Sequence, residues 1–229
     1  MKLGFVTLFP EIIHSSVSMS ILGRAQTNGI VTFATSNPRD FTYDRHHKVD
    51  DSPYGGEAGM LLKAEPVALA IESLPFFPSA KIVFCEPHGR VFEQEDAVNL
   101  SSEESLIFAC GHYEGLDARL EEYYNPLVFS IGHFIVTGGE LPALIIADAI
   151  VRLLPGVLGN SNSLLSDSFS EFNNGLISAP NYTRPEIWRD IPVPPQVLSG
   201  NHELIQNFRT EQSRLRTKNL LKDQERHTN

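Results

Sequence analysis

Short, continuous runs of apolar residues, each closed by a turn signal, constrain the fold of this chain more than any other sequence feature. Residues 81–85 end at the turn 87–89 (Pro-His-Gly), and residues 106–110 end at Gly111. Runs of this kind are typical of strands that are buried on both faces of a parallel sheet. They alternate with helical patterns over the first two-thirds of the chain. The sequence therefore predicts an α/β domain with a parallel central sheet.

Other periodic segments complete this alternation. The expected strands are residues 2–9, 30–35, 81–85, 106–110 and 127–131, and the expected helices are residues 11–26, 66–74, 116–124, 140–154 and 201–222. A Gly-rich turn at 132–139 precedes the helix at 140–154. Segment 37–59 has no apolar periodicity, and loops of this length are usually functional lids or disordered.

The composition of the chain changes after Leu158. Residues 160–170 are rich in Ser and Asn, and residues 191–199 contain three prolines. Both stretches are typical of linkers. The sequence predicts a first domain at 1–159, an interdomain linker at 160–178 and a short helical C-terminal domain at 179–229.

Composition excludes several classes of protein. The 229 residues are 41% hydrophobic and 20% charged, which rules out intrinsic disorder. With 2 Cys, a disulfide framework and a zinc site built mainly of thiolates are excluded. The most apolar stretch, 141–154, contains Asp148 and Arg152, and the apolar start of the chain ends at Pro10 and Glu11. We therefore expect neither a membrane span nor a secretory signal, and we expect a protein of the reducing cytoplasm.

A formal net charge of −10 means that the surface as a whole does not attract polyanions. A nucleic-acid partner would need local basic patches, and the sequence contains two candidates. From charge alone, both are better interpreted as solvated faces of the protein. The acidic residues Glu211, Asp223 and Glu225 also reduce the positive charge of the second candidate. The first candidate comprises Arg39, Arg45, His46, His47 and Lys48, and the second comprises Arg209, Arg214, Arg216, Lys218, Lys222 and Arg226.

Three turns follow predicted strands, at 87–90, 111–115 and 132–139. Ligands of open α/β sheets bind beyond the carboxyl ends of the strands, so the convergence of these turns predicts a binding crevice. None of the turns contains G-x-G-x-x-G or a Walker A lysine, and a cradle for nucleotide phosphates is not supported.

An ordered set of short motifs runs along the chain. They are PRDF (38–41), VDD (49–51), PYGG (53–56), CGHYEG (110–115), GGELP (138–142), PGVLG (155–159), DSF (167–169), YTRP (182–185) and LSGNH (198–202).

In this order, the motifs resemble the TrmD family of bacterial tRNA (guanine-N1)-methyltransferases, from Met1 to about Arg216. The resemblance implies the SPOUT α/β fold with a deep trefoil knot at its carboxyl end. It also implies a homodimer with active sites shared between subunits, and a helical C-terminal domain that binds the anticodon arm of tRNA. The implied reaction is S-adenosylmethionine-dependent methylation of N1 of the guanosine immediately 3′ of the anticodon, with a possible Mg²⁺ requirement.

This chemistry needs particular groups, because N1 of guanine carries a proton and its lone pair is not free. A base must accept that proton, and a cation must stabilise the negative charge that develops on O6. By the resemblance, Asp167 is the base and Arg152 stabilises the charge, while Glu114 matches a family position tied to activity and to the magnesium dependence.

Each of these catalytic residues has a structural alternative. Asp167 could cap a following helix, since Asp is a common N-cap. Arg152 could pair with Asp148, four residues earlier on the same helix face, or could be oriented by it. Glu114 could be a solvated turn residue.

Cofactor contacts in the family come largely from backbone groups, which explains the glycines. The matching positions are Phe84, Cys85, Glu86, Pro87, Gly111, Tyr113, Gly115, Ile131, Gly132, His133, Phe134, Ile135, Val136, Gly138, Gly139 and Leu141. Cys110 lies among them, but a buried cysteine is ordinarily a small hydrophobe, and we assign it no chemistry.

The loop 50–59 is expected to fold over the RNA substrate. By the resemblance, Asp50 lies near the guanine, and Arg39, Arg45, His46 and Lys48 could contact phosphates. A chain with a negative net charge can therefore bind RNA, because only the charge close to the RNA needs to be positive.

The chain departs from the family pattern at His88, at His133-Phe134 and at Glu57-Ala58, and its sequence ends early, at Asn229. His133 could alter a hydrogen bond beside the cofactor, and the short end could weaken tRNA binding. If these departures spoil the pocket, the chain would be an RNA-binding relative that has lost turnover. A separate alternative is a SPOUT enzyme that modifies another RNA or another base.

Overall fold

The computed structural model describes residues 1–159 and 167–228, with side chains through Lys222. The chain divides into two compact units, Met1–Gly159 and Asn160–Asn229. Residues 160–166 of the expected linker lie outside the described residues.

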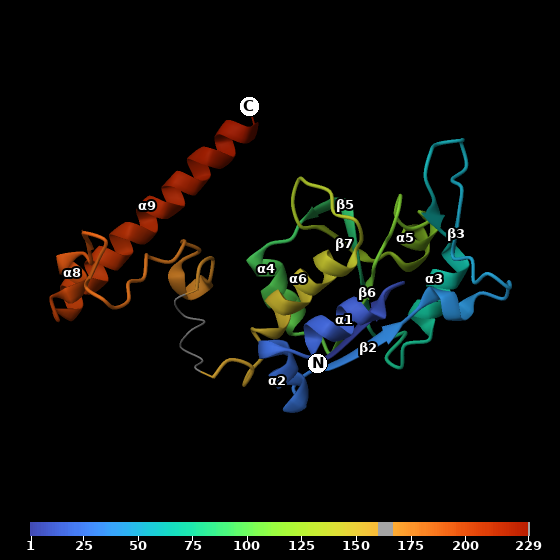
Figure 1. Ribbon diagram of the computed structural model, residues 1–229, viewed down its shortest axis with the longest axis horizontal. Helices are drawn as coiled ribbons and strands as arrows, with labels where there is room; N and C mark the ends of the chain where they lie inside the picture. The colour runs from blue at the N-terminus through green and yellow to red at the C-terminus, as the bar shows by residue number, and fades with distance from the viewer. Residues whose placement is uncertain (160–166, 229) are drawn as a thin grey trace. The chain divides into compact units, whose positions relative to one another are not determined.

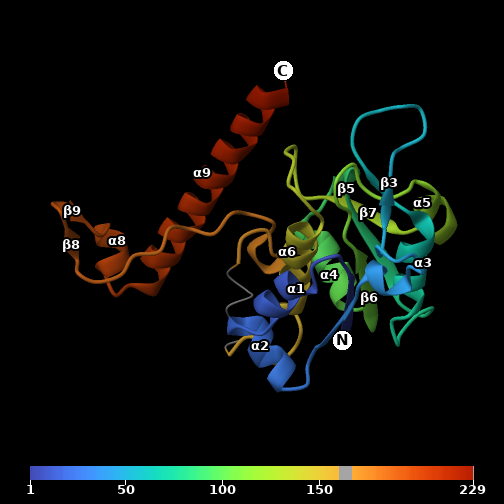
Figure 2. The same cartoon turned by 45° about the vertical axis from the view of Figure 1, so that its right-hand side comes forward.

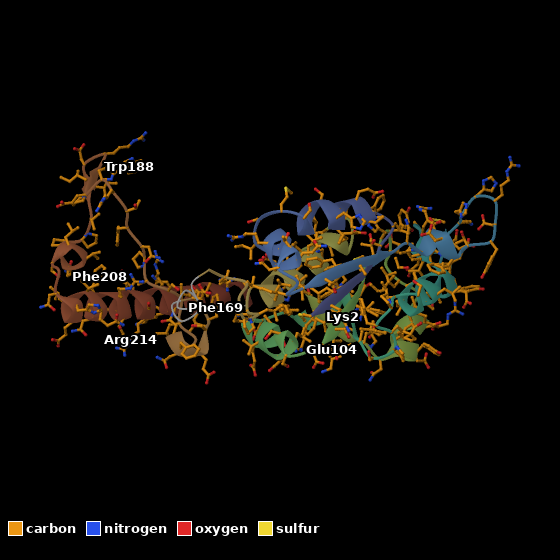
Figure 3. All side chains as sticks on the ribbon, turned by 90° about the horizontal axis from the view of Figure 1, so that it is seen from below. Lys2, Glu104, Phe169, Trp188, Phe208 and Arg214 are labelled. Carbon is orange, nitrogen blue, oxygen red and sulfur yellow. The ribbon has the colours of Figure 1, made fainter. Side chains whose placement is uncertain are left out.

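The first unit is built on a five-stranded sheet in the order β2-β1-β6-β5-β7 (Figure 1). Every neighbouring pair in it is parallel, which confirms the predicted α/β class with a parallel central sheet. The strands are β1 (Lys2–Val6), β2 (Thr32–Ser36), β5 (Lys81–Val91), β6 (Ser105–Ala109) and β7 (Leu127–Ser130). At the start of β1, Lys2 Nζ lies 2.9 Å from Glu104 Oε1, next to β6 (Figure 3).

Helices cover both faces of this sheet. One face is covered by α1 (Pro10–Val17), α2 (Ser20–Thr27), α4 (Gln94–Ser101) and α6 (Glu140–Val151), and the other by α3 (Ala64–Glu72) and α5 (Arg119–Tyr124). Along β1, Leu3 and Phe5 enter the first core and Val6 enters the second. Phe5 stacks on Phe108 of β6 with ring centroids 5.2 Å apart. The continuous apolar runs therefore reflect burial on both faces.

The expected helix 11–26 is wrong in one respect, because it consists of the two helices α1 and α2. The chain leaves the helical conformation at Met19, whose φ and ψ are −114° and 162°. Ser16 Oγ donates to the carbonyl of Ile12 and Ser18 Oγ to that of Ser15. Serine side chains that bond to the backbone in this way compete with helix formation.

Strand β5 bulges at the end that faces the predicted crevice. Cys85 and Arg90 both pair with Phe129, so residues 86–89 leave the ladder. Gly89 is needed there, because a Cβ would lie 2.7 Å from the backbone nitrogen of Phe129.

Segment 37–59 contains regular structure that its sequence did not predict. A 3₁₀ helix, η1 (Pro38–Phe41), opens it, and β3 (Asp50–Asp51) pairs with β4 (Leu61–Leu62). Between them, Asp44 accepts backbone hydrogen bonds from His46 at 2.9 Å and from Lys48 at 3.0 Å. These bonds lower the pKa of the Asp44 carboxyl.

The second unit is described by itself. The hairpin β8 (Ile187–Trp188) and β9 (Ile191–Pro192) turns at Arg189 and Asp190, both of positive φ. It is followed by α8 (Pro195–Leu198) and the long helix α9 (His202–Thr228), and it is preceded by the 3₁₀ helix η2 (Glu171–Asn173) (Figure 2). The expected linker over 191–199 is thus partly regular structure.

Helix α9 also fixes the segment before the hairpin. Its Thr217 Oγ1 accepts a hydrogen bond from the Ile177 N–H at 2.9 Å, and Arg216 donates to the carbonyl of Ser178 at 3.1 Å. Within residues 1–159 and 167–228, no helix is long and apolar enough to cross a membrane.

Candidate active site

The segments that follow β5, β6 and β7 meet around a cleft of 240 Å³. We call residues 111–115 the floor turn and residues 131–139 the roof loop; the bulge of β5 forms the remaining wall. The cleft lies at the carboxyl ends of parallel strands, where ligands of such sheets bind.

Most of the residues expected to bind a cofactor line this cleft. They are Cys85, Glu86, Pro87, Gly111, Tyr113, Gly115, Ile131, Phe134, Ile135, Val136, Gly138 and Gly139. Phe84, Gly132, His133 and Leu141 belong to the same segments but are not among the lining residues. The catalytic candidate Glu114 also lines the cleft. Five further lining residues were not expected from the sequence to bind the cofactor: His112, Phe129, Ser130, Thr137 and Pro142.

The floor turn and the roof loop approach each other backbone to backbone. The Gly139 N–H donates to the Gly111 carbonyl at 2.8 Å. A Cβ at Gly139 would lie 2.7 Å from Cys110 Cα, so only glycine permits this approach. The two segments are therefore held together by their main chains, and both line the cleft.

Glu86 places a carboxylate in this cleft. A Cβ at Gly111 would lie 3.1 Å from its Oε1, and one at Gly115 would lie 3.5 Å from its Oε2. Burial raises the pKa of the Glu86 carboxyl, Glu121 raises it further and His88 opposes the rise. No hydrogen bond to this carboxylate is found among the described residues, so it is free to accept one from a donor group on a ligand.

The two cysteines beside the cleft are chemically inert. Burial raises the pKa of the Cys85 thiol to about 12 and raises that of Cys110 as well. Both thiols are protonated at neutral pH, and only the thiolate is a nucleophile.

Glu114 joins the floor turn to the end of the 50–59 loop. Its backbone N–H donates to the Met60 carbonyl at 3.0 Å, and its side chain lies where a Cβ of Gly59 would be. Gly59 has a φ of 107°, which favours glycine independently. Across the described ranges, no group of three or more His, Cys, Asp or Glu side chains could hold a metal ion.

The two other catalytic candidates belong to different units. Arg152 is the C-cap of α6, and its N–H donates to the carbonyl of Asp148 at 3.1 Å. Asp167 precedes η2 in the second unit, and the N-cap of η2 is Ser170, whose side chain accepts a hydrogen bond from the Asn173 N–H. The pairing of Arg152 with Asp167 at one reaction centre rests on the family resemblance.

The substrate candidates lie around η1 and β3. Arg39 is in η1 and donates to the carbonyl of His47 at 3.4 Å, and Asp50 begins β3. Arg45 and His46 are exposed in the turn that Asp44 organises. Lys48, in the same turn, lies 3.3 Å from Asp51.

The family model and the relatives that match this chain all describe the same kind of protein. The family model described as tRNA (Guanine-1)-methyltransferase TrmD matches residues 1–225. A tRNA (guanine-N(1)-)-methyltransferase of Carboxydothermus hydrogenoformans is 48% identical over 217 residues, which are 95% of this chain and 84% of that protein. The protein of the same name from Bacillus subtilis is 47% identical over an alignment of 229 residues, covering 97% of this chain and 93% of the relative. In Dehalococcoides mccartyi the identity is 48% over 219 residues, with coverages of 95% and 87%.

Proposed function

Since the chain belongs to the TrmD family of tRNA (guanine-1)-methyltransferases, we propose that it transfers a methyl group from S-adenosylmethionine to N1 of a guanosine in tRNA. The observation that carries the proposal is the cleft between the floor turn and the roof loop, because the family motifs CGHYEG and GGELP both contribute to it. The target is the guanosine immediately 3′ of the anticodon. Since tRNA is its substrate, we place the enzyme in the cytoplasm.

The cleft supports binding of the methyl donor in two ways. Ile131, Phe134, Ile135 and Val136 supply an apolar wall for an adenosyl group. Glu86 supplies a carboxylate for the hydroxyl or ammonium groups of the donor.

The donor supplies an electrophilic methyl group on a sulfonium. In the proposed step, Asp167 accepts the proton of guanine N1 while Arg152 donates hydrogen bonds to O6, where negative charge develops. The freed N1 lone pair forms a bond to the methyl carbon, and the carbon–sulfur bond breaks with its electrons going to sulfur. S-adenosylhomocysteine and a protonated Asp167 remain, so atoms and charges balance.

Magnesium has no assigned step. Mg²⁺ is usually held by one or two carboxylates together with waters and substrate oxygens, and Glu114 is the carboxylate that the family resemblance assigns to it.

The trefoil knot at the carboxyl end of the first domain is part of the proposal, as is binding of the anticodon arm by the C-terminal domain at 179–229. The chain has a net charge of −10, so this binding depends on local cations. Arg209, Arg214, Arg216, Lys218 and Lys222 gather on α9, which supports that role.

A homodimer is proposed because apolar side chains beside the cleft face solvent. Ile135 is 79% exposed, Phe134 57%, Leu141 54% and Ile145 53%. Exposed apolar side chains in such numbers mark interaction sites, and a second copy of the chain would cover these and complete the active site.

Ile145→Glu is therefore expected to produce a monomer that has lost methyl transfer, because a charge buried in an interface is costly. Val98→Glu, on the exposed side of α4, is the matched control and should remain a dimer. Sedimentation velocity at the assay concentration measures both. An active monomer would contradict the shared site.

Glu86→Gln is expected to weaken binding of S-adenosylhomocysteine by about 10-fold, because the ligand loses a charged acceptor. It should also raise the melting temperature of the free protein at neutral pH. The pKa of Glu86 is higher in the folded protein than in the unfolded chain, so ionisation of Glu86 lowers the free energy of unfolding at any pH above the pKa of the unfolded carboxyl. Glutamine does not ionise and therefore removes this loss of stability. The gain should vanish on acidification below about pH 4.

Calorimetric titration and a melting curve of each variant test this pair of effects. Glu122→Gln, on the exposed face of α5, is the control and should change neither. Unchanged ligand affinity in Glu86→Gln would remove Glu86 from the binding site.

The reaction itself is tested with purified protein, labelled S-adenosylmethionine and tRNA transcripts that carry guanosine or adenosine 3′ of the anticodon. We expect 1-methylguanosine in the first transcript and no label in the second. Binding without product would favour the RNA-binding relative, and label in the adenosine transcript would favour another target base.

A further inference from the structure

A buried carboxylate lies directly behind the cleft. Glu140, the first residue of α6, is 2% exposed. Its Oε1 accepts a hydrogen bond from Thr7 Oγ1 at 2.5 Å, and its Oε2 lies 2.7 Å from His112 Nε2. These contacts join the end of β1, the floor turn and the start of α6, which are far apart in sequence.

The hydrogen bonds of Thr7 have a defined direction, whereas the bond between His112 and Glu140 depends on the histidine tautomer. The Phe9 N–H donates to Thr7 Oγ1 at 2.9 Å, so the hydroxyl proton of Thr7 is directed to Glu140. An ionised Glu140 only accepts, which requires a proton on His112 Nε2. The N-terminus of α6 favours negative charge at this position.

The ring of His112, a residue of the floor turn, lies against the roof loop. It lies 4.9 Å from the Phe9 ring, measured between centroids, and a Cβ at Gly138 would be 2.4 Å from its Nε2. His112 also pairs with Gly138 in an isolated β-bridge and lines the cleft. The orientation of this ring therefore determines how closely the roof loop can approach the floor turn.

We propose that Thr7 and Glu140 are positioning residues that act through His112 to hold the roof loop in the conformation that binds the methyl donor. This inference rests on the proposed function of the cleft. Neither Thr7 nor Glu140 is among the residues that line the cleft, so their effect on the donor is indirect.

Thr7→Val keeps the shape of the side chain but leaves one oxygen of Glu140 without a donor. We expect the dissociation constant of S-adenosylhomocysteine to rise by about 10-fold, while kcat at saturating donor stays within about 2-fold of the wild type. Thr7→Ser restores the hydroxyl and should restore the affinity. Thr35→Val is the matched control, because it removes a threonine–histidine contact of 3.1 Å to His14 outside the cleft.

Hydrogen–deuterium exchange of the ligand-free protein provides a second readout that needs no donor. Faster exchange confined to peptides from the roof loop and floor turn in Thr7→Val supports the proposal. Glu140→Gln, which keeps the side-chain volume, should show the same pattern, and it serves if Thr7→Val folds poorly.

Unchanged exchange in both variants, or exchange that rises equally over the whole first unit, would overturn the proposal. So would a loss of kcat with no change in donor affinity. If the wild-type protein itself fails to bind S-adenosylhomocysteine, the proposed function fails, whereas the exchange experiment still decides whether the network holds the roof loop.

Discussion

Asp167→Asn is expected to lower kcat by about 10²–10⁴-fold, the range in which a general base contributes to proton transfer. Asparagine has nearly the same shape as aspartate but cannot accept the N1 proton. The affinity for S-adenosylmethionine should change little, because the residues that line the cleft belong to the first unit. Single-turnover methylation of a tRNA transcript and calorimetric titration of the donor measure the two quantities.

The matched control for this variant is Asp117→Asn. The Asp117 carboxylate is paired with Arg119 at 2.6 Å, an arrangement that lowers its pKa, and it lies outside the proposed reaction. Its loss weakens the ion pair and the backbone hydrogen bond to Arg119 at the start of α5, and it should leave turnover within about 2-fold of the wild type. Full activity of Asp167→Asn at neutral pH would exclude Asp167 as the base.

Gly139→Ala should abolish tight binding of the methyl donor. The added Cβ would lie 2.7 Å from Cys110 Cα and 2.8 Å from the Gly111 nitrogen, and these backbone atoms cannot move aside as a flexible side chain does. The roof loop must then shift away from the floor turn, and overpacking of this kind is expected to raise the dissociation constant by about 100-fold.

Titration with S-adenosylhomocysteine compares this variant with Gly159→Ala. A Cβ at Gly159 meets no atom of the described residues within 4 Å, so the control adds the same methyl group without that close contact. Equal affinities in the two variants would show that the close approach of Gly139 and Gly111 does not shape the binding site.

The sequence predicts the central sheet well because its strands are buried on both faces. Leu106, Ile107 and Phe108 of β6 are all fully buried, and a run of apolar residues is the direct record of that environment. Helix α4 leaves no such record. It buries Ala97 and Leu100 but also Asp96, whose carboxylate pairs with Arg90 of β5, so its pattern is not that of a simple amphipathic helix.

Only part of the candidate site could be predicted from the sequence, because only part of it has a signal in the local sequence. The turns that form the cleft carry local signals, glycines directly after strands, and the sequence identifies them. The network behind the cleft has no local signal, since Thr7 and Glu140 are 133 residues apart and each is an ordinary residue in its own segment. Only the fold shows that a threonine at the end of β1 directs its proton to a carboxylate at the start of α6.

A crystal structure of this protein with S-adenosylhomocysteine would test the central claim most directly. We expect the ligand in the cleft, with its adenosyl group between the floor turn and the roof loop and a polar group on Glu86. We also expect Arg152 and Asp167, from one subunit or two, to face the open side where a guanine would lie. An empty cleft at saturating ligand, or the ligand bound elsewhere, would exclude the proposed binding site.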